Sequence, residues 1–364
     1  MNVGEQSLST RQCIGYFSPY LPPEIVWACG MTPVRLRPGT SQAAAEGFLP
    51  RNFSVEARAL LASALDGNFS TSSGQALAIE AAIFLDEDDT SRRFFDVWRA
   101  SVDIPALGLV ALPRLNNDLA CQRYADALTE LAASLGTISG QSLTMGGLRR
   151  AVGLYNEQRA LLRDFRQRWI DGGLSAGDWY DLRWLALTTD PVSANAELTA
   201  SLGQMPLPAR PPGGGPRLFV LSGMHVPRQF LTFLETCGAR VVAEDSEADE
   251  RTLTEPVSLA LDSGQMDFHI RGLAAAYLNK PPSPRPNALL RRLASITQLL
   301  NTRQVQGVIA MYPKFADSYL AEYIGLSELF RERGLPALLL EDDGESGFSG
   351  QQRTRIEAFL EVLA

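Results

Sequence analysis

The chain has 364 residues, of which 45% are hydrophobic and 20% are charged, enough for two or three domains with a sizeable core. This composition excludes a disordered or collagen-like protein. The net charge of −8 argues against sequence-independent binding to nucleic acid or to an anionic membrane. Since Lys280 and Lys314 are the only lysines, phosphate sites would have to be built mainly from arginine.

The sequence contains no apolar run of about 20 residues, the length needed to cross a bilayer. Its first residues, MNVGEQSLSTRQ, lack the apolar centre of a signal peptide. We therefore expect a cytoplasmic protein without membrane contact. The four cysteines are spaced too widely for a zinc motif or a disulfide framework, and we expect them to be ordinary buried thiols; they are Cys13, Cys29, Cys121 and Cys237.

Residues 1–117 alternate helical and extended patterns. A helix is expected at residues 24–29, before the extended TPVRL, and a second helix follows Ser54. The apolar run ALAIEAAIFL, a helix at 91–100 and the run IPALGLVAL complete the segment. This order predicts an N-terminal α/β lobe.

Residues 118–202 have a helical period throughout, with Leu148, Val152 and Tyr155 among the apolar positions. We interpret them as a helical region between two lobes. The segment 203–216, GQMPLPARPPGGGP, is rich in proline and glycine and is expected to be a linker.

Residues 217–364 carry a βαβ pattern, with parallel strands expected at 218–221 and 240–243. VQGVIAM precedes a helix at 316–333, and GLPALLLEDD precedes a helix at 350–363. The overall prediction is an α/β fold of two doubly wound, flavodoxin-like parallel-sheet lobes with a helical region between them. Ligands should bind near the loops at 222–227, 312–317 and 341–349, where strands end.

Few motifs of known chemistry are present. The sequence lacks HExxH, CxxC, GxSxG, GxGxxG and GxxxxGKS. His225 lies in the first strand-to-helix turn after the linker and could act as an acid, a base or a hydrogen-bond donor, although a solvated residue at a helix start is the simpler interpretation. His269 is more typical of a structural residue. An acidic group after a strand could bind a cation but is more often only solvated; it comprises Asp342, Asp343 and Glu345.

Several segments in a common order resemble the 2-hydroxyacyl-CoA dehydratase and benzoyl-CoA reductase family over nearly the whole chain. They are GYFSPYLPPEIVWACGMTPVRL, SRRFFDVWR, GLYNEQRALL, RLFVLSG, QGVIAMYPKFADSYLAEY, GLPALLLEDD and QQRTRIEAFLEVL. The resemblance implies a subunit of two α/β lobes that pairs with a homologous subunit. It also implies a four-iron-four-sulfur cluster held by three cysteines, an acyl-CoA thioester beside it, and an ATP-dependent activator that supplies an electron.

The sequence departs from this family at the three cluster-ligand positions. The residue matching the first cysteine is Ser54 in NFSVEAR, where Arg58 is retained; the second is Asp88 in DDTSRR and the third is Ala316 in KFADS. Serine, carboxylate and methyl groups cannot together replace three thiolates on iron. We therefore expect no cofactor and no metal in this chain, and a cluster only in the partner subunit.

Our leading hypothesis is a cluster-less subunit of such a complex, which contributes to structure and to acyl-CoA binding beside a homologous cluster-bearing subunit. The substrate-binding candidates are Ser222, His225, Arg58 and Lys314. The apolar helices at 319–333 and 355–363 could supply the interface.

Two alternatives stay open. The fold could serve a non-redox enzyme or a binding protein for acyl-CoA or another anion, with His225, Ser222 and nearby arginines as its site. A mononuclear metal on Asp88, Asp89 and Asp317 ranks lowest, because nothing in the sequence shows that these carboxylates meet.

Overall fold

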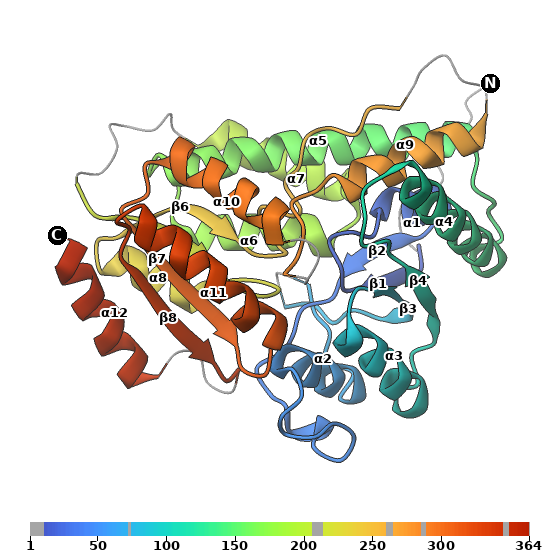
Figure 1. Ribbon diagram of the computed structural model, residues 1–364. Helices are drawn as coiled ribbons and strands as arrows, with labels where there is room; N and C mark the ends of the chain where they lie inside the picture. Colours follow the sequence, from blue (N-terminus) through green and yellow to red (C-terminus); the bar gives the residue numbers. More distant parts are fainter. Residues whose placement is uncertain are drawn as a thin grey trace.

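The computed structural model describes residues 11–71, 74–205, 214–259, 265–284, 289–344 and 349–363. They form two four-stranded parallel sheets flanked by helices, which lie side by side in Figure 1. Within these ranges, no helix combines the length and the apolar character needed to span a bilayer. The predicted α/β fold with two lobes is confirmed.

The first sheet has the strand order β2-β1-β3-β4. Its strands are β1 (Cys13–Tyr16), β2 (Thr32–Arg35), β3 (Ile79–Asp86) and β4 (Ala106–Ala111). The helices of this lobe are α1 (Pro23–Ala28), α2 (Val55–Leu65) and α3 (Asp89–Ser101), with a short 3-10 turn, η1 (Ala43–Ala45).

The second sheet repeats this arrangement as β6-β5-β7-β8. Its strands are β5 (Arg217–Leu221), β6 (Arg240–Asp245), β7 (Gly307–Pro313) and β8 (Ala337–Asp342). In both sheets the second strand lies outside the first and the third lies on its other side, which is the flavodoxin-like order.

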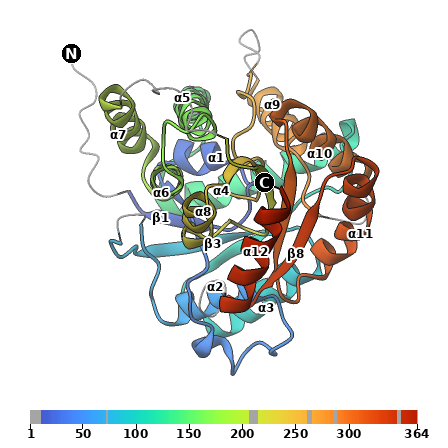
Figure 2. The same cartoon turned by 90° about the vertical axis from the view of Figure 1, so that its left-hand side faces the viewer.

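Alternating side chains bury both faces of the second sheet. Leu218 and Val220 of β5 belong to the core formed with α8 (Arg228–Thr236) and α12 (Gly350–Leu363). Phe219 and Leu221 belong to the core formed with α10 (Leu289–Arg303) and α11 (Asp317–Glu332). Figure 2 shows the sheet between these two helix layers. Burial on both faces explains why the strands read as continuous apolar runs.

The predicted helical region forms four helices, α4 (Asp118–Ser139), α5 (Met145–Ile170), α6 (Ala176–Thr188) and α7 (Pro191–Gln204). Each begins at a residue whose side chain accepts a backbone hydrogen bond, namely Asn117, Thr144, Ser175 and Asp190. The long helix α5 runs across the top of both lobes in Figure 1. This layer therefore spans the two sheets.

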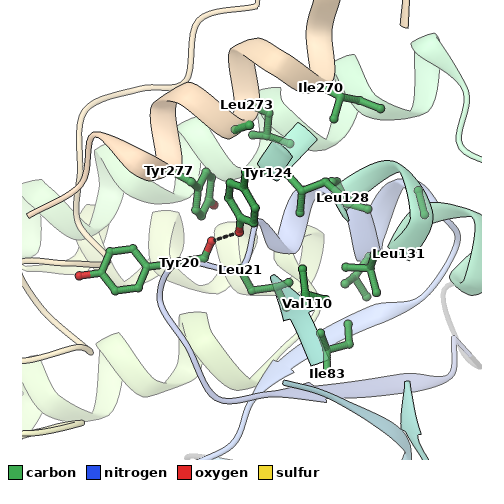
Figure 3. Close-up of a cluster of buried hydrophobic side chains, with 14 of the residues drawn as sticks. Tyr20, Leu21, Ile83, Val110, Tyr124, Leu128, Leu131, Ile270, Leu273 and Tyr277 are labelled. Carbon is green, nitrogen blue, oxygen red and sulfur yellow. Dashed lines mark hydrogen bonds between the residues drawn. The ribbon is translucent and has the colours of Figure 1, made fainter. Parts of the chain in front are cut away.

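Helix α9 (Met266–Leu278) follows the linker in sequence but packs against α4 on the first lobe. Figure 3 shows Ile270, Leu273 and Tyr277 of α9 together with side chains of α4 and of the first sheet. The Tyr124 hydroxyl of α4 donates to the Tyr20 carbonyl at 2.5 Å in the same cluster. The division into 1–117, 118–202, 203–216 and 217–364 remains a prediction, and residues 206–213 of the linker lie outside the described residues.

Candidate functional site

The carboxyl ends of the two sheets open onto a shared cavity of about 600 Å³. Phe17 and Glu87 directly follow β1 and β3 of the first sheet, while Met224 and Phe315 follow β5 and β7 of the second sheet; all four line this cavity. Ligands of open parallel sheets bind at such edges. We call it the N-cap cavity, for the three residues described next.

The three positions matched to cluster cysteines all line the N-cap cavity, and each is the N-cap of a helix: Ser54 of α2, Asp88 of α3 and Ala316 of α11. Ser54 Oγ accepts a hydrogen bond from the Ala57 N–H at 3.5 Å. Asp88 Oδ1 accepts from the Ser91 N–H at 2.8 Å. Two of the three matched positions therefore carry residues that satisfy a helix end, where unpaired N–H groups favour an oxygen acceptor.

The turn that carries Ala316 is strained. Phe315 has a φ of 63°, in the left-handed region that a phenylalanine rarely adopts. Its side chain lines the N-cap cavity and is 45% exposed. Strain of this kind costs about 1–3 kcal/mol and concentrates at functional sites. The loop between β7 and α11 thus adopts an unfavourable backbone conformation, in which Phe315 and Ala316 line the cavity.

The donor atoms of the N-cap cavity do not fit an iron-sulfur cluster. No described residue that lines it is a cysteine. Cys13 begins β1, at the opposite end of the strand from the cavity. Cys29 is buried away from the cavity lining, and burial raises the pKa of its thiol to about 11.

The cysteines were expected to be buried thiols. This is correct for Cys29, but Cys13, Cys121 and Cys237 are only partly buried. The expectation was wrong for these three because each lies at the end or on the outer side of its element, where packing is incomplete.

The N-cap cavity is strongly acidic. Its described lining has one arginine, Arg114, and six carboxylic acids: Glu56, Glu87, Asp88, Asp89, Glu247 and Asp317. These acids do not assemble a metal site, since the described residues hold no group of three or more histidine, cysteine or acidic side chains able to bind a metal ion. The described residues thus give no support to the mononuclear-metal alternative on Asp88, Asp89 and Asp317. Glu345, of the second acidic group, lies outside the described residues.

Glu56, in the first turn of α2, joins the two lobes. Its Oε1 accepts a hydrogen bond from the Met224 N–H at 2.7 Å, in the loop after β5. A Cβ atom on Gly223 would lie 2.5 Å from Glu56 Oε1, so only glycine leaves room for the carboxyl group. Burial and the nearby Glu247 carboxylate raise the pKa of Glu56 to about 8. Glu56 also lines a second cavity.

This second cavity, the Arg37 pocket, has a volume of about 400 Å³. It lies between the chain after β2, the face of α2 and the loop after β5, and Arg37, Tyr180, Ser222 and His225 are among its lining residues. The structure thus brings together two of the four substrate-binding candidates, Ser222 and His225. The residues at its edge match the loops expected at 222–227 and 341–349, as far as these are described.

The environment of Ser222 and His225 limits their chemistry. Ser222 Oγ donates its proton to the His225 carbonyl at 3.1 Å and so stabilises the turn. The His225 ring is packed 5.7 Å from that of Trp184, which corrects the interpretation of a solvated ring. Burial and the guanidinium groups of Arg183 and Arg37 lower the pKa of His225 to about 3. The imidazole is therefore neutral at neutral pH.

The other two candidates, Arg58 and Lys314, line neither cavity. Arg58 is buried within α2, and its Nη1 donates to the Arg51 carbonyl at 3.4 Å. The Lys314 side chain is 42% exposed, and its Nζ lies 3.9 Å from Asp343 Oδ2. Sequence reasoning missed Arg37 and Glu56. The position of Arg37 just after a predicted strand was the available signal.

Known proteins match nearly the whole chain. The family model described as 2-hydroxyglutaryl-CoA dehydratase, D-component, matches residues 19–363. The beta subunit of (R)-phenyllactyl-CoA dehydratase from Clostridium sporogenes is 22% identical over 360 residues, covering 97% of this chain and 92% of the relative.

Two further relatives have the same extent. The beta subunit of (R)-2-hydroxyglutaryl-CoA dehydratase from Acidaminococcus fermentans is 23% identical over 375 residues, covering 97% of this chain and 93% of the relative. A benzoyl-CoA reductase subunit from Thauera aromatica is 23% identical over 368 residues, covering 97% of this chain and 91% of the relative. The family resemblance predicted from the sequence is confirmed, and the chain belongs to the 2-hydroxyglutaryl-CoA dehydratase D-component family.

Proposed function

We propose that this chain is a cluster-less subunit of an acyl-CoA dehydratase-like or reductase-like complex. The observation that carries the proposal is the N-cap cavity, where three helix N-termini meet and the three positions matched to cluster cysteines are Ser54, Asp88 and Ala316. The relatives are named as subunits of such enzymes. In this proposal a homologous partner subunit holds the cluster and receives electrons from an ATP-dependent activator.

The role of this chain in the complex is to shape the substrate site and bind part of the acyl-CoA. Electron transfer is left to the partner, since the cavity offers iron no thiolate. The thioester would approach the facing sheet edges, where Ser222 and His225 line the Arg37 pocket. A cytoplasmic location is part of the same proposal.

Exposed apolar side chains on the second lobe support a partner interface. Ile324 of α11 is 68% exposed and Val362 of α12 is 76% exposed, on the helices that the sequence suggested for this role. Leu290, at the start of α10, is 82% exposed and lies in the same helix layer as Ile324, whereas α12 covers the other face of the sheet. Covering apolar groups of this kind with a partner subunit removes them from water and stabilises the complex.

Co-expression with a homologous chain that keeps its three cysteines tests the proposal. Under anaerobic conditions we expect a stoichiometric complex with one four-iron cluster, and the chain purified alone should contain neither iron nor sulfide. Ile324→Glu with Leu290→Glu, on the neighbouring helices α11 and α10, should weaken the complex at least tenfold, because charge would be buried in an apolar interface. Leu119→Glu, at a 63% exposed site on α4, is the matched control.

Two results would contradict the proposal. One is a cluster with stoichiometric sulfide bound by this chain alone. The other is a chain that stays free of every cysteine-bearing homologue encoded near it. The second result, combined with binding of small molecules, would favour the alternative of a binding protein or non-redox enzyme for acyl-CoA or another anion, which the Arg37 pocket supports.

A further inference from the structure

The Arg37 pocket contains a positive charge that the described residues do not neutralise. Three arginines line the described part of the pocket, and two of them are paired with carboxylates: Arg35 with Glu247 at 2.7 Å, and Arg228 with Asp181 at 2.9 Å. Arg37 is in no ion pair of the described residues. A partly buried guanidinium without a counter-ion is costly, and a bound anion would relieve that cost.

The neighbours of Arg37 hold its guanidinium in place without neutralising it. Its Nη2 donates to the Thr71 carbonyl at 3.5 Å, and its Cζ lies 5.5 Å from the centre of the Trp184 ring. Arg37 also forms a hydrogen bond with the Tyr180 hydroxyl. Because the Tyr180 oxygen is the acceptor in that bond, its own proton stays available for a ligand.

A second polar group beside Arg37 is incompletely satisfied. His225 Nδ1 is buried and has no hydrogen-bond partner among the described residues. A neutral imidazole can present one N–H to an acceptor. Arg37 and Tyr180 thus supply a cation and a hydroxyl group to the lining, a set that suits an oxyanion, while the His225 ring lies 6.3 Å from the Tyr180 ring.

The remainder of the pocket is apolar enough for a carbon skeleton. Leu36, Val55, Phe69 and Leu77 contribute to its lining. Two acids, Glu56 and Asp342, also line it; burial raises the pKa of Glu56 to about 8, so this carboxyl group is largely neutral at neutral pH and repels an anion little. An apolar wall and a single cationic end favour an organic acid over inorganic phosphate.

We propose that the Arg37 pocket binds the carboxylate of a small organic acid, with Arg37 as its counter-ion, Tyr180 as a hydrogen-bond donor, and the apolar lining around the carbon skeleton. The acid is either free or the far end of a carboxylated acyl group on coenzyme A. The inference deepens the proposed binding of an anionic small molecule. It does not depend on the partner subunit, because the pocket lies within this chain.

Titration calorimetry on the isolated chain tests the inference. The probes are hexanoate, 3-phenylpropionate, glutarate and glutaryl-CoA, with hexanol, hexanoyl-CoA and inorganic phosphate as comparisons. We expect saturable binding of at least one carboxylate-bearing probe and no measurable binding of hexanol. If glutaryl-CoA binds more tightly than both glutarate and hexanoyl-CoA, the natural ligand is a carboxylated acyl group on coenzyme A. If a free acid binds most tightly, the natural ligand is a free organic acid.

Substitutions at Arg37 test whether this residue binds the carboxylate. Arg37→Gln should weaken binding about 10- to 100-fold, since a charge-assisted bond to a carboxylate is lost. Arg37→Lys keeps the charge but not the planar fork and should weaken it less. Arg51→Gln is the control, because Arg51 is 86% exposed and lies 3.8 Å from Glu46, outside the pocket lining.

The inference is overturned by any of three results: no carboxylate-bearing probe binds, phosphate binds more tightly than all of them, or Arg37→Gln weakens binding no more than Arg51→Gln. None of these results bears on assembly with a cluster-bearing subunit, which is measured separately by co-purification. Unfolding midpoints of Arg37→Gln and Arg37→Lys, compared with the unmodified chain, separate a lost contact from a lost fold.

Discussion

At the residue scale, two of the three positions matched to cluster cysteines have a structural role of their own. Ser54 and Asp88 place an oxygen where a helix N-terminus presents unpaired N–H groups, and Asp88 also shares a reciprocal capping box with Ser91. These side chains stabilise α2 and α3 directly. In the proposed cluster-less subunit, these caps would give the fold around the cavity a source of stability that does not depend on a cluster.

Asp88→Ala should lower the free energy of unfolding by about 0.5–2 kcal/mol, the usual cost of losing an N-cap. Asp89→Ala is the matched control, because Asp89 is 78% exposed and its nearest cationic atom, Arg93 Nε, is 3.6 Å away. Such an exposed pair contributes about 0–1 kcal/mol. Urea unfolding of both variants decides the point, and equal losses would refute a specific capping role for Asp88.

Glu56 should make stability depend on pH. Its pKa is raised from the ordinary value of 4.5 to about 8 on folding, so the folded chain keeps a proton that the unfolded chain releases. Stability contributed by this group is therefore complete below about pH 4.5, falls as the pH rises towards 8, and is constant above that. Glu56→Gln removes this loss.

We therefore compare the free energy of unfolding of Glu56→Gln with that of the unmodified chain at two pH values. The difference should shift in favour of the variant by at least about 1 kcal/mol from pH 5 to pH 8.5, since one pKa unit corresponds to about 1.4 kcal/mol. Urea unfolding midpoints at the two pH values measure this difference. An unchanged difference at both values would mean that Glu56 is ionised in the folded chain.

At this scale, the sequence indicated residues that belong to a motif. It did not indicate residues whose role depends on contacts with distant parts of the chain. The segments NFSVEAR, DDTSRR and KFADS led to three residues that the structure places on one cavity. Arg37 and Glu56 belong to no motif. Their importance comes from the approach of the loop after β5, which lies about 170 residues further along the chain, and no local pattern reports such a contact.

At the element scale, two helices of the second lobe were predictable. The helix expected at 316–333 is observed as Asp317–Glu332, and the helix at 350–363 is observed as Gly350–Leu363. The central strand β1 was not predicted, because it has only four residues and contains Gly15. A Cβ on Gly15 would lie 2.6 Å from Leu36 Cδ1, so close packing requires glycine in a strand that it would otherwise weaken.

The convergence of three helix N-termini leads to a reconstruction experiment. Three cysteines at positions 54, 88 and 316 would place three thiols where positive helix ends favour thiolates. We expect the variant Ser54→Cys, Asp88→Cys, Ala316→Cys to take up a four-iron cluster after anaerobic reconstitution. Absorbance near 400 nm with iron and sulfide analysis would detect it.

The matched control keeps the first two cysteines and replaces Ala316→Cys by Ala321→Cys. Ala321 also lines the N-cap cavity, but it lies within α11 and not at its cap. The control should bind substantially less iron. Equal uptake by both variants, or none by the first, would show that the helix caps do not preserve the geometry of a cluster site.

At the scale of the whole molecule, the fold class could be predicted, but the way the lobes meet could not. Repeated βα patterns indicated two parallel sheets, and both have the same strand order. The contact of α9 with α4 joins segments on either side of the linker, and sequence periodicity carries no information about such a partner. The two cavities exist because the carboxyl edges of the sheets face each other.

Buried charge fixes this arrangement. Arg35, at the end of β2, pairs with Glu247 of the second lobe, and their side chains are only 3% and 14% exposed. Arg159 of α5 pairs with the fully buried Glu24 of α1 and with the Tyr277 hydroxyl of α9. Pairs of this kind need not add net stability, but breaking one leaves a buried charge alone.

Arg35→Leu should therefore lower the free energy of unfolding by about 3 kcal/mol, because Glu247 loses its counter-ion in a buried position. Burial already raises the pKa of Glu247 to about 6, against the pull of Arg35, so its carboxyl should take up a proton in the variant. Arg92→Leu is the control, since Arg92 is 50% exposed beside Asp86, and it should cost far less. Urea unfolding measures the loss in both variants.

The double variant Arg35→Leu, Glu247→Leu should recover part of the loss, because no unpaired charge remains. If Arg35→Leu lost as little stability as Arg92→Leu, water would have to reach the contact between the lobes.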